Sequence, residues 1–253
     1  MGASHKSLGG VMKAALRLIY PPQCIACGTA VDATGALCPE CWRDCDFITG
    51  CACDLCGVPL PGLAGQQENV TDLRCDDCLT APPPWQRGRA ALVYGDVGRA
   101  LALSLKHADR PDLAEPLGAW LSNAASALIA PGMIVAPIPL HPTRMMKRRY
   151  NQAALLSDRL ARAHGLTHLP GLLRRIRATG AQDHRSHAER HRNLEGAIAV
   201  APRHRDRIAG RPVLLVDDVM ASGATLDAAS RVLAAARAGP VSVAVLARAV
   251  KTL

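Results

Sequence analysis

The sequence VLLVDDVMASGAT, residues 213–225, joins an apolar run to two carboxylates and then to a loop of small and hydroxyl-bearing residues. Residues 213–216 predict a buried strand, and a helix is expected to begin at about Thr225. Asp217 and Asp218 would then stand at the carboxyl end of a strand, where α/β proteins bind their ligands. This stretch therefore predicts an α/β fold with a ligand site at the strand end.

The loop after the two aspartates suits a phosphate group. Its backbone N–H groups, at the start of a helix, and the hydroxyls of Ser222 and Thr225 are all donors. The carboxylates accept hydrogen bonds from sugar hydroxyls, so a ribose 5-phosphate fits both halves of the segment. An ordinary turn capped by the aspartates is the alternative, but it requires neither the carboxylate pair nor this order of small residues. Without a GxxxxGK[ST] or GxGxxG motif, the chain is not expected to be a nucleoside triphosphatase or a dinucleotide-binding protein.

Strand-like and helix-like patterns alternate from residue 85 onward. The expected strands are 90–94, 134–138, 196–200 and 241–246, and the expected helices are 97–107, 150–164 and 225–238. This alternation predicts a mostly parallel sheet flanked by helices. Prolines 82–84 mark a boundary. We therefore divide the chain into an N-terminal amphipathic helix (1–23), a cysteine-rich module (24–81) and an α/β domain (85–253).

The cysteine-rich module contains all ten cysteines of the chain. Eight of them form four CxxC pairs: Cys24 and Cys27, Cys38 and Cys41, Cys53 and Cys56, Cys75 and Cys78. Two such pairs supply the four thiolates of a tetrahedral zinc site, so a small double zinc ribbon with two structural zinc ions is expected. We favour pairing between sequence neighbours, although the spacing also allows a crossed arrangement. Cys45 and Cys51 are interpreted as spare thiols, with Cys45 as an alternative ligand.

Charge is divided unevenly along the chain, which carries a formal +9 overall. Residues 24–78 hold nine acids and two bases, whereas residues 79–253 carry a net +13. An acidic module repels phosphate, so we expect it to contact a protein, for example the basic half of the chain itself, rather than nucleic acid. Residues 174–211 hold ten arginines and four acids. They could form a solvated loop, close over a ligand and supply cations to departing pyrophosphate, or bind single-stranded DNA by charge.

The cysteines also indicate the cellular compartment. Thiolates that bind metal must stay reduced, which favours a cytoplasmic location. The apolar stretches 8–20 and 124–140 are interrupted by charges or prolines, so no membrane span is expected.

Residues 213–225 closely resemble the phosphoribosyl pyrophosphate (PRPP) loop of type I phosphoribosyltransferases. The resemblance implies that fold, with Asp217 and Asp218 as catalytic residues on the ribose hydroxyls and magnesium bridging ribose and pyrophosphate. It also implies that the 5-phosphate is held by the five loop residues Ala221, Ser222, Gly223, Ala224 and Thr225.

Other segments resemble the ComF family. These are PLHPTR at 139–144, RRYNQ at 148–152, SLKH around Lys106, and 172–179 with Gln182, Arg190 and Asn193. The resemblance places pyrophosphate or anion contacts at Lys106, Arg144, Lys147 and Arg148. For Arg144 and Lys147 the alternative is a solvated basic helix start. Arg149 stands where the family signature has glycine and Tyr150 where it has phenylalanine. The backbone is therefore expected to be less free there, and an extra cation lies beside the pyrophosphate region.

The family implies a role in handling incoming single-stranded DNA during natural transformation. One alternative is an active magnesium-dependent phosphoribosyltransferase whose acceptor is an unidentified nucleobase-like molecule. Another is a degenerate fold that binds PRPP as a regulatory ligand. No residues indicate a nucleobase pocket, so the sequence leaves open whether the protein is an enzyme.

Overall fold

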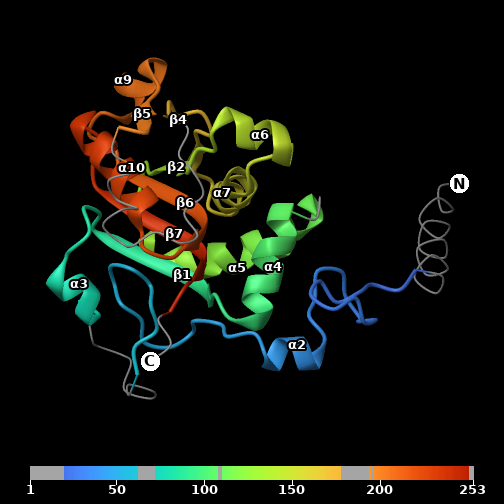
Figure 1. The fold of residues 1–253 in the computed structure, drawn as a ribbon. Helices are drawn as coiled ribbons and strands as arrows, with labels where there is room; N and C mark the ends of the chain where they lie inside the picture. The colour runs from blue at the N-terminus through green and yellow to red at the C-terminus, as the bar shows by residue number, and fades with distance from the viewer. Residues whose placement is uncertain (1–19, 62–71, 108–109, 178–193, 195, 251–253) are drawn as a thin grey trace, which may run out of the picture.

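The computed structural model describes residues 20–61, 72–107, 110–177, 194 and 196–250 (Figure 1). The helix expected over 1–23 lies almost entirely outside the described residues. Where the chain is described, at residues 20–23, it is not helical; Gln23 instead forms an isolated bridge with Ala30.

A five-stranded parallel sheet forms the centre of the α/β domain, in the order β1-β7-β6-β2-β3. Its strands are β1 (Arg87–Val93), β2 (Ile134–Pro137), β3 (Thr167–His168), β6 (Val213–Met220) and β7 (Val241–Arg248). Residues alternate between its two faces: Val213 and Leu215 belong to one buried cluster, Leu214 and Val216 to the other. The expected mostly parallel α/β fold is confirmed.

Helices cover both faces of the sheet (Figure 1). One face packs against α4 (Asp96–His107), α5 (Ala114–Ala125) and α7 (Gln152–Ala163), and the other against α10 (Ala224–Ala235). A short helix, α6 (Pro142–Arg148), follows β2. The remaining short elements are α2 (Pro39–Arg43), α3 (Asp76–Thr80), α9 (Arg205–Ile208) and the 3-10 turns η1 (Pro111–Leu113), η2 (Ser126–Leu128) and η3 (Pro202–His204).

Two sequence expectations need correction. The strand expected at 196–200 is β5 (Ile198–Val200), and it pairs antiparallel with β4 (Leu173–Arg175) outside the main sheet. The strand expected to stop at residue 216 runs on to Met220, so Asp217 and Asp218 lie within β6 rather than after it. The parallel partner β7 holds this extension, because the β6–β7 pairing continues to Met220 and Arg248.

The cysteine-rich module packs onto the free edge of β1. Ile48 donates its backbone N–H to the Ala91 carbonyl at 2.9 Å, and Val93 donates to the Asp46 carbonyl at 2.9 Å. The carboxylate of Asp54 pairs with the guanidinium of Arg89 on β1 at 2.5 Å, with both side chains largely shielded from solvent. The acidic module thus contacts the basic domain of its own chain, and the backbone groups of an exposed strand edge gain partners.

Acidification is expected to destabilise the fold through His168 on β3. Burial, assisted by the charge of Arg162, lowers the pKa of His168. Its Nε2 lies 2.8 Å from the Ser157 hydroxyl, and its Nδ1 lies 3.6 Å from an Asp158 carboxylate oxygen. The unfolded chain therefore takes up the proton first, so the stability present above about pH 6.5 is lost as the pH falls toward the lower, folded pKa.

Urea unfolding of wild type and His168→Gln between pH 7.5 and 5.5 measures this effect. One proton contributes a slope of at most about 1.4 kcal/mol per pH unit, and the variant should lose part of the wild-type slope. Equal slopes would show that His168 does not cause the acid sensitivity.

Candidate functional site

The segment between β6 and α10 forms a tight loop at the carboxyl edge of the sheet. Gly223 takes a left-handed backbone conformation with φ 74° and is the N-cap residue of α10. The twelve-residue helix α10 begins immediately afterwards at Ala224. The unpaired N–H groups and the dipole of its first turn favour an anion there. The loop residues expected to hold phosphate therefore occupy a helix start.

The two aspartates lie beside this loop. A backbone N–H from Asp218 donates to the Asp217 carboxylate at 2.9 Å, and Val219 donates to the Asp218 carboxylate at 2.9 Å. Burial and the neighbouring Asp218 raise the pKa of Asp217 well above its usual range, while the charge of Lys106 opposes that rise. The ionised form of Asp217 is therefore disfavoured in the free protein, and a ligand hydroxyl or a cation at this position would stabilise it.

Lys106 was expected to contact the pyrophosphate, and it lies in the last turn of α4. Its positive charge works against the rise in the pKa of Asp217. The contact of Lys106 with pyrophosphate stays a prediction.

The signature segment around Asn151 connects three elements of this edge. The Asn151 side chain donates to the Ile138 carbonyl at 2.9 Å after β2, and it accepts the Ala153 N–H at 3.1 Å to cap α7. Tyr150 donates its hydroxyl to the Leu105 carbonyl of α4 at 2.7 Å, and Gln152 donates to the Lys106 carbonyl at 3.3 Å. These side chains tie the segment between α6 and α7 to the end of β2 and to the last turn of α4.

Arg149 ends α6 in the left-handed region, with φ 64° and ψ −26°. This is the backbone conformation that glycine adopts without cost, and glycine is the residue that the ComF resemblance implies at this position. The backbone at Arg149 was expected to be restricted, and it is: a non-glycine residue holds a conformation that favours glycine. Arg144, Lys147 and Arg148 lie on α6, which leaves the carboxyl end of β2, and β2 pairs directly with β6. Their helix thus begins at the edge of the sheet that carries the aspartates.

Sequence reasoning missed two side chains that brace the loop. Arg248, at the end of β7, donates from Nη1 to the carbonyls of Met220 at 3.1 Å, Ala221 at 2.7 Å and Ala249 at 2.6 Å. Trp85 is buried and lies against Gly223, where an added Cβ would come within 3.2 Å of its ring. Neither residue has a local sequence signal, because each reaches the loop from a distant part of the chain.

Gly223→Ala is expected to weaken ligand binding at the loop. The new methyl group disfavours the left-handed backbone by about 1–2 kcal/mol and also presses on the indole. Gly132→Ala is a matched control, because Gly132 has φ 69° and open space around its Cβ position. Urea unfolding should show a loss of stability for both variants, larger for Gly223→Ala because of the indole, whereas titration with PRPP should show weaker binding only for Gly223→Ala. Equal PRPP affinities would mean that the loop tolerates the methyl group.

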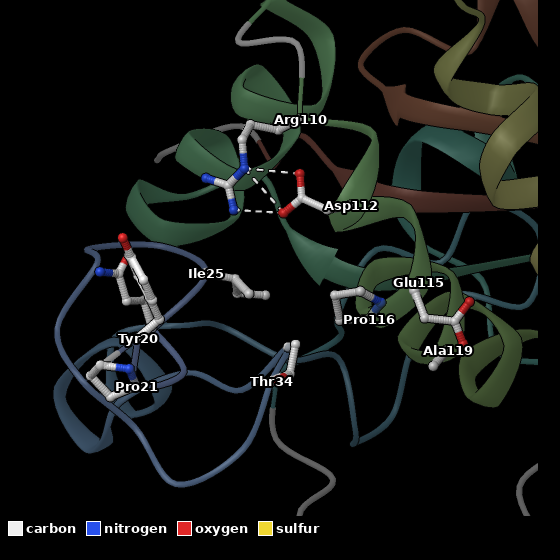
Figure 2. A pocket seen from close by; sticks show the side chains of 11 residues that line it. Tyr20, Pro21, Ile25, Thr34, Arg110, Asp112, Glu115, Pro116 and Ala119 are labelled. Carbon is white, nitrogen blue, oxygen red and sulfur yellow. Dashed lines mark hydrogen bonds and ion pairs between the residues drawn. The ribbon is translucent and has the colours of Figure 1, made fainter. Parts of the chain in front are cut away.

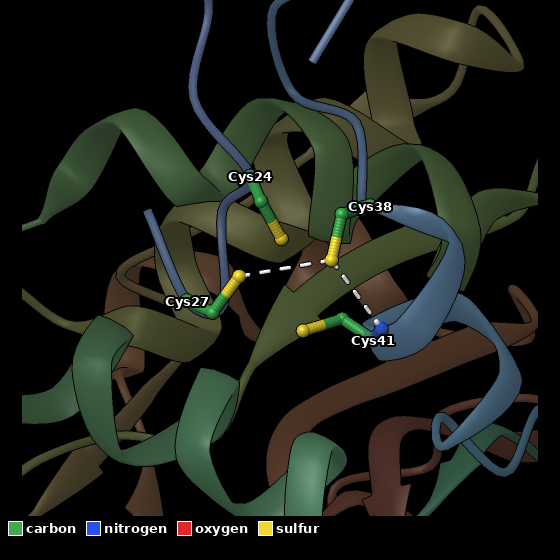
Figure 3. Close-up of side chains that lie close together, drawn as sticks. All are labelled: Cys24, Cys27, Cys38 and Cys41. Atoms are coloured by element: carbon green, nitrogen blue, oxygen red, sulfur yellow. Dashed lines mark hydrogen bonds between the residues drawn. The ribbon is translucent and has the colours of Figure 1, made fainter. Parts of the chain in front are cut away.

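Eight cysteines form two compact groups. Cys24, Cys27, Cys38 and Cys41 make the first tetrad, shown in Figure 3, and Cys53, Cys56, Cys75 and Cys78 make the second; within each, all sulfurs lie within 4.8 Å of one another. Zn–S bonds of about 2.3 Å in a tetrahedron place sulfurs about 3.8 Å apart. The Cys27–Cys38 and Cys56–Cys75 sulfur separations are 3.7 and 3.6 Å. The two tetrads therefore fit a double zinc ribbon.

Sequence neighbours, rather than crossed pairs, make up these tetrads. Gly28 and Gly57, which follow the knuckles, have φ values of 82° and 70° and donate to the Cys24 and Cys53 carbonyls. Cys45, the alternative ligand, lies outside both tetrads. Burial and nearby Asp46 raise the pKa of Cys45 to about 11, so it stays a protonated thiol.

A separate cavity of about 590 Å³ lies between the first part of the cysteine-rich module and α5 (Figure 2). Its wall includes Tyr20, Ile25 and Pro116. Arg110 is bound to Asp112 through three hydrogen bonds of 2.8–3.1 Å, so much of its charge is neutralised. This cavity lacks the combination of paired acids and helix start found at the loop after β6.

Comparison with known families matches residues 15–79 to the Double zinc ribbon domain and residues 164–252 to the Phosphoribosyl transferase domain. A relative named DNA utilization protein YhgH, from Salmonella typhi, is 30% identical over 231 residues, which cover 89% of each chain. The chain belongs to the ComF family. Competence protein F of Haemophilus influenzae is 29% identical to this ComF-family chain over 197 residues, covering 74% of this chain and 83% of that protein.

A solved structure titled as the allosteric regulatory enzyme of purine biosynthesis is also similar to this ComF-family chain, at 19% identity and a TM-score of 0.38. The similarity covers 57% of this chain and 30% of that one. Within the described residues, no helix has the length and apolar character needed to cross a bilayer.

Proposed function

We propose that this ComF-family chain binds PRPP with magnesium at the loop after β6 and uses that site in the handling of single-stranded DNA. The placement of Asp217 and Asp218 near the end of β6, followed by a short loop and the start of α10, carries the proposal. The ribose hydroxyls would donate to the two carboxylates, and the loop N–H groups would donate to the 5-phosphate. Residues 217–225 would then supply acceptors for the ribose hydroxyls and donors for the 5-phosphate.

Magnesium prefers oxygen ligands, and the aspartate carboxylates provide them. When bound with PRPP, the ion would neutralise charge on the pyrophosphate. The raised pKa of Asp217 supports this assignment, because a cation nearby would offset the repulsion between the two carboxylates.

Calorimetric titration of the zinc-replete protein with PRPP and magnesium tests the proposal. Saturable binding is expected, with weaker binding of ribose 5-phosphate, which lacks the pyrophosphate. Absence of binding by a folded protein would overturn it. Pyrophosphate release in a screen of nucleobases would show a phosphoribosyltransferase reaction at the same site.

The DNA part of the proposal is supported by the names of the relatives and by an arginine-rich surface near β4 and η3. Arg174, Arg203 and Arg207 are exposed. Burial lowers the pKa of His204, and the charges of Arg203, Arg207 and Arg174 lower it further, so all three act on the same imidazole. Within the described part of the chain, no acidic side chain pairs with these three arginines. Clustered and uncompensated guanidinium groups suit a phosphate backbone.

Binding of single-stranded DNA is expected to fall at least about tenfold between roughly 50 and 200 mM salt, because counterion release provides most of its free energy. Arg203→Gln/Arg207→Gln should reduce both the affinity and the salt slope. Arg43→Gln is a matched control, since Arg43 is an exposed arginine paired with Asp44 in the acidic module. Fluorescence anisotropy of a labelled oligonucleotide measures the DNA affinity of wild type and of both variants at each salt concentration. Salt-independent binding, or equal losses in both variants, would contradict this assignment.

A further inference from the structure

Trp85 lies between the second cysteine tetrad and the segment of residues 221–225 that joins β6 to α10, called the phosphate loop below. Its indole Nε1 donates to the Leu55 carbonyl at 2.6 Å, and Leu55 belongs to the knuckle between Cys53 and Cys56. The opposite end of the ring contacts Gly223, the residue that caps α10. The side chain is only 6% exposed, so both contacts are made inside the protein. A single rigid ring therefore joins a metal-binding knuckle to the loop.

The core around Trp85 is continuous with both the tetrad and the loop. Cys53, Cys56 and Cys78 belong to the same buried cluster as Met220 at the end of β6 and Leu226 at the start of α10. Backbone pairing reinforces this packing, because Gly88 of β1 donates to the Asp54 carbonyl of the knuckle at 2.7 Å. The knuckle thus has a fixed position relative to the sheet.

The first tetrad has a different environment. Ile25, which lies between Cys24 and Cys27, packs in the cluster on the other face of the sheet, with Leu101 of α4 and Leu117 of α5. None of the first-tetrad cysteines shares the cluster that contains Trp85 and Met220 among the described residues. The chain therefore carries two chemically matched tetrads, of which only the second is packed against the loop.

We propose that Trp85 is a positioning residue that couples zinc at the second tetrad to ligand binding at the phosphate loop, and that the first tetrad lacks this coupling. The inference rests on the proposed PRPP site. Zinc fixes the knuckle, the Leu55 carbonyl fixes the indole, and the indole supports Gly223. Without zinc, the buried indole N–H loses a fixed acceptor, and the ligand must order the loop as it binds.

Thermodynamic linkage requires the reverse effect: PRPP must tighten zinc binding at the second tetrad by the same factor. The test measures, at equilibrium, the competition for zinc between the full-length protein and a chelating dye, with and without PRPP and magnesium. PRPP should raise the zinc affinity of one of the two phases at least about fivefold and leave the other unchanged. Cys75→Ser should remove the PRPP-sensitive phase, whereas Cys41→Ser should remove the insensitive one. Asp217→Asn/Asp218→Asn with PRPP present controls for metal binding by the ligand itself.

Trp85→Phe tests the role of the indole, since it keeps a ring against Gly223 but removes the N–H donor. We expect a several-fold weaker affinity for PRPP and the loss of the PRPP-sensitive zinc phase. In Trp42→Phe/Trp120→Phe, where Trp85 is the remaining tryptophan, PRPP should change the emission of Trp85, because the ring touches the loop. Bound PRPP with unchanged zinc affinity would overturn the coupling alone. No PRPP binding by folded wild type would overturn the proposed function and, with it, the coupling.

Discussion

Asp217→Asn/Asp218→Asn is expected to abolish saturable PRPP binding while leaving the fold intact or more stable. Each lost hydrogen bond to a charged acceptor costs about 1.5–3 kcal/mol, so losing two corresponds to at least about a 100-fold weaker affinity. The free protein gains from the same change, because burial and mutual repulsion disfavour two carboxylates at this position. Loss of binding with a gain of stability is the pattern expected of residues kept for function.

Calorimetry with PRPP and magnesium, together with thermal unfolding, measures both effects. Asp227→Asn is the matched control, because Asp227 lies in the first turn of α10 and its carboxylate is paired with Arg231. The control should bind PRPP like wild type. Retained binding by the double variant would show that these carboxylates do not hold the ribose, and a large drop in stability would show that they are structural.

Loss of the second tetrad is expected to destabilise the whole protein far more than loss of the first. Cys53, Cys56 and Cys78 are buried in the cluster that contains Leu215 and Val243 of the central sheet. Cys56→Ser should therefore lower the free energy of unfolding by more than about 4 kcal/mol, as expected when a structural metal is lost from a core.

Cys41→Ser provides the comparison, since Cys41 is only partly buried and lies outside this cluster. Its effect should be confined to the first ribbon and leave the main transition near its wild-type midpoint. Urea unfolding followed by far-ultraviolet circular dichroism, with zinc content measured for each protein, tests the difference. Equal midpoints for the two variants would mean that the sheet does not depend on the second tetrad.

Local patterns were enough to predict the main features of the fold and the candidate loop. The apolar run at 213–216 identified β6, because a central parallel strand is buried on both faces. The pattern at 97–107 likewise identified α4, which spans Asp96–His107. The regular CxxC spacing indicated the tetrads, since one knuckle can present only two thiolates to a metal.

Features set by long-range contacts were not predictable in this way. β5 had the local pattern of a strand, and only tertiary packing decides that it pairs with β4 rather than with the main sheet. No strand was predicted at β4. Helix α5 was missed because Pro116 and Gly118 interrupt its pattern, although a proline is tolerated in a first turn. Trp85 contacts Leu55, thirty residues earlier, and Gly223, much later in the chain. Contacts between such distant residues produce no periodic pattern in the sequence.

The placement of β1 at the edge of the sheet has a consequence for biosynthesis. Its neighbour in the sheet is β7, the last strand, which leaves the ribosome roughly 150 residues after β1 has been made. During that interval an apolar strand would have two unpaired edges, a condition that promotes aggregation. The cysteine-rich module precedes β1, and it already covers one of those edges through Asp46 and Ile48. We expect the zinc-loaded module to shield the nascent strand until the C-terminal strand arrives, so that metal supply during translation limits the yield of folded protein.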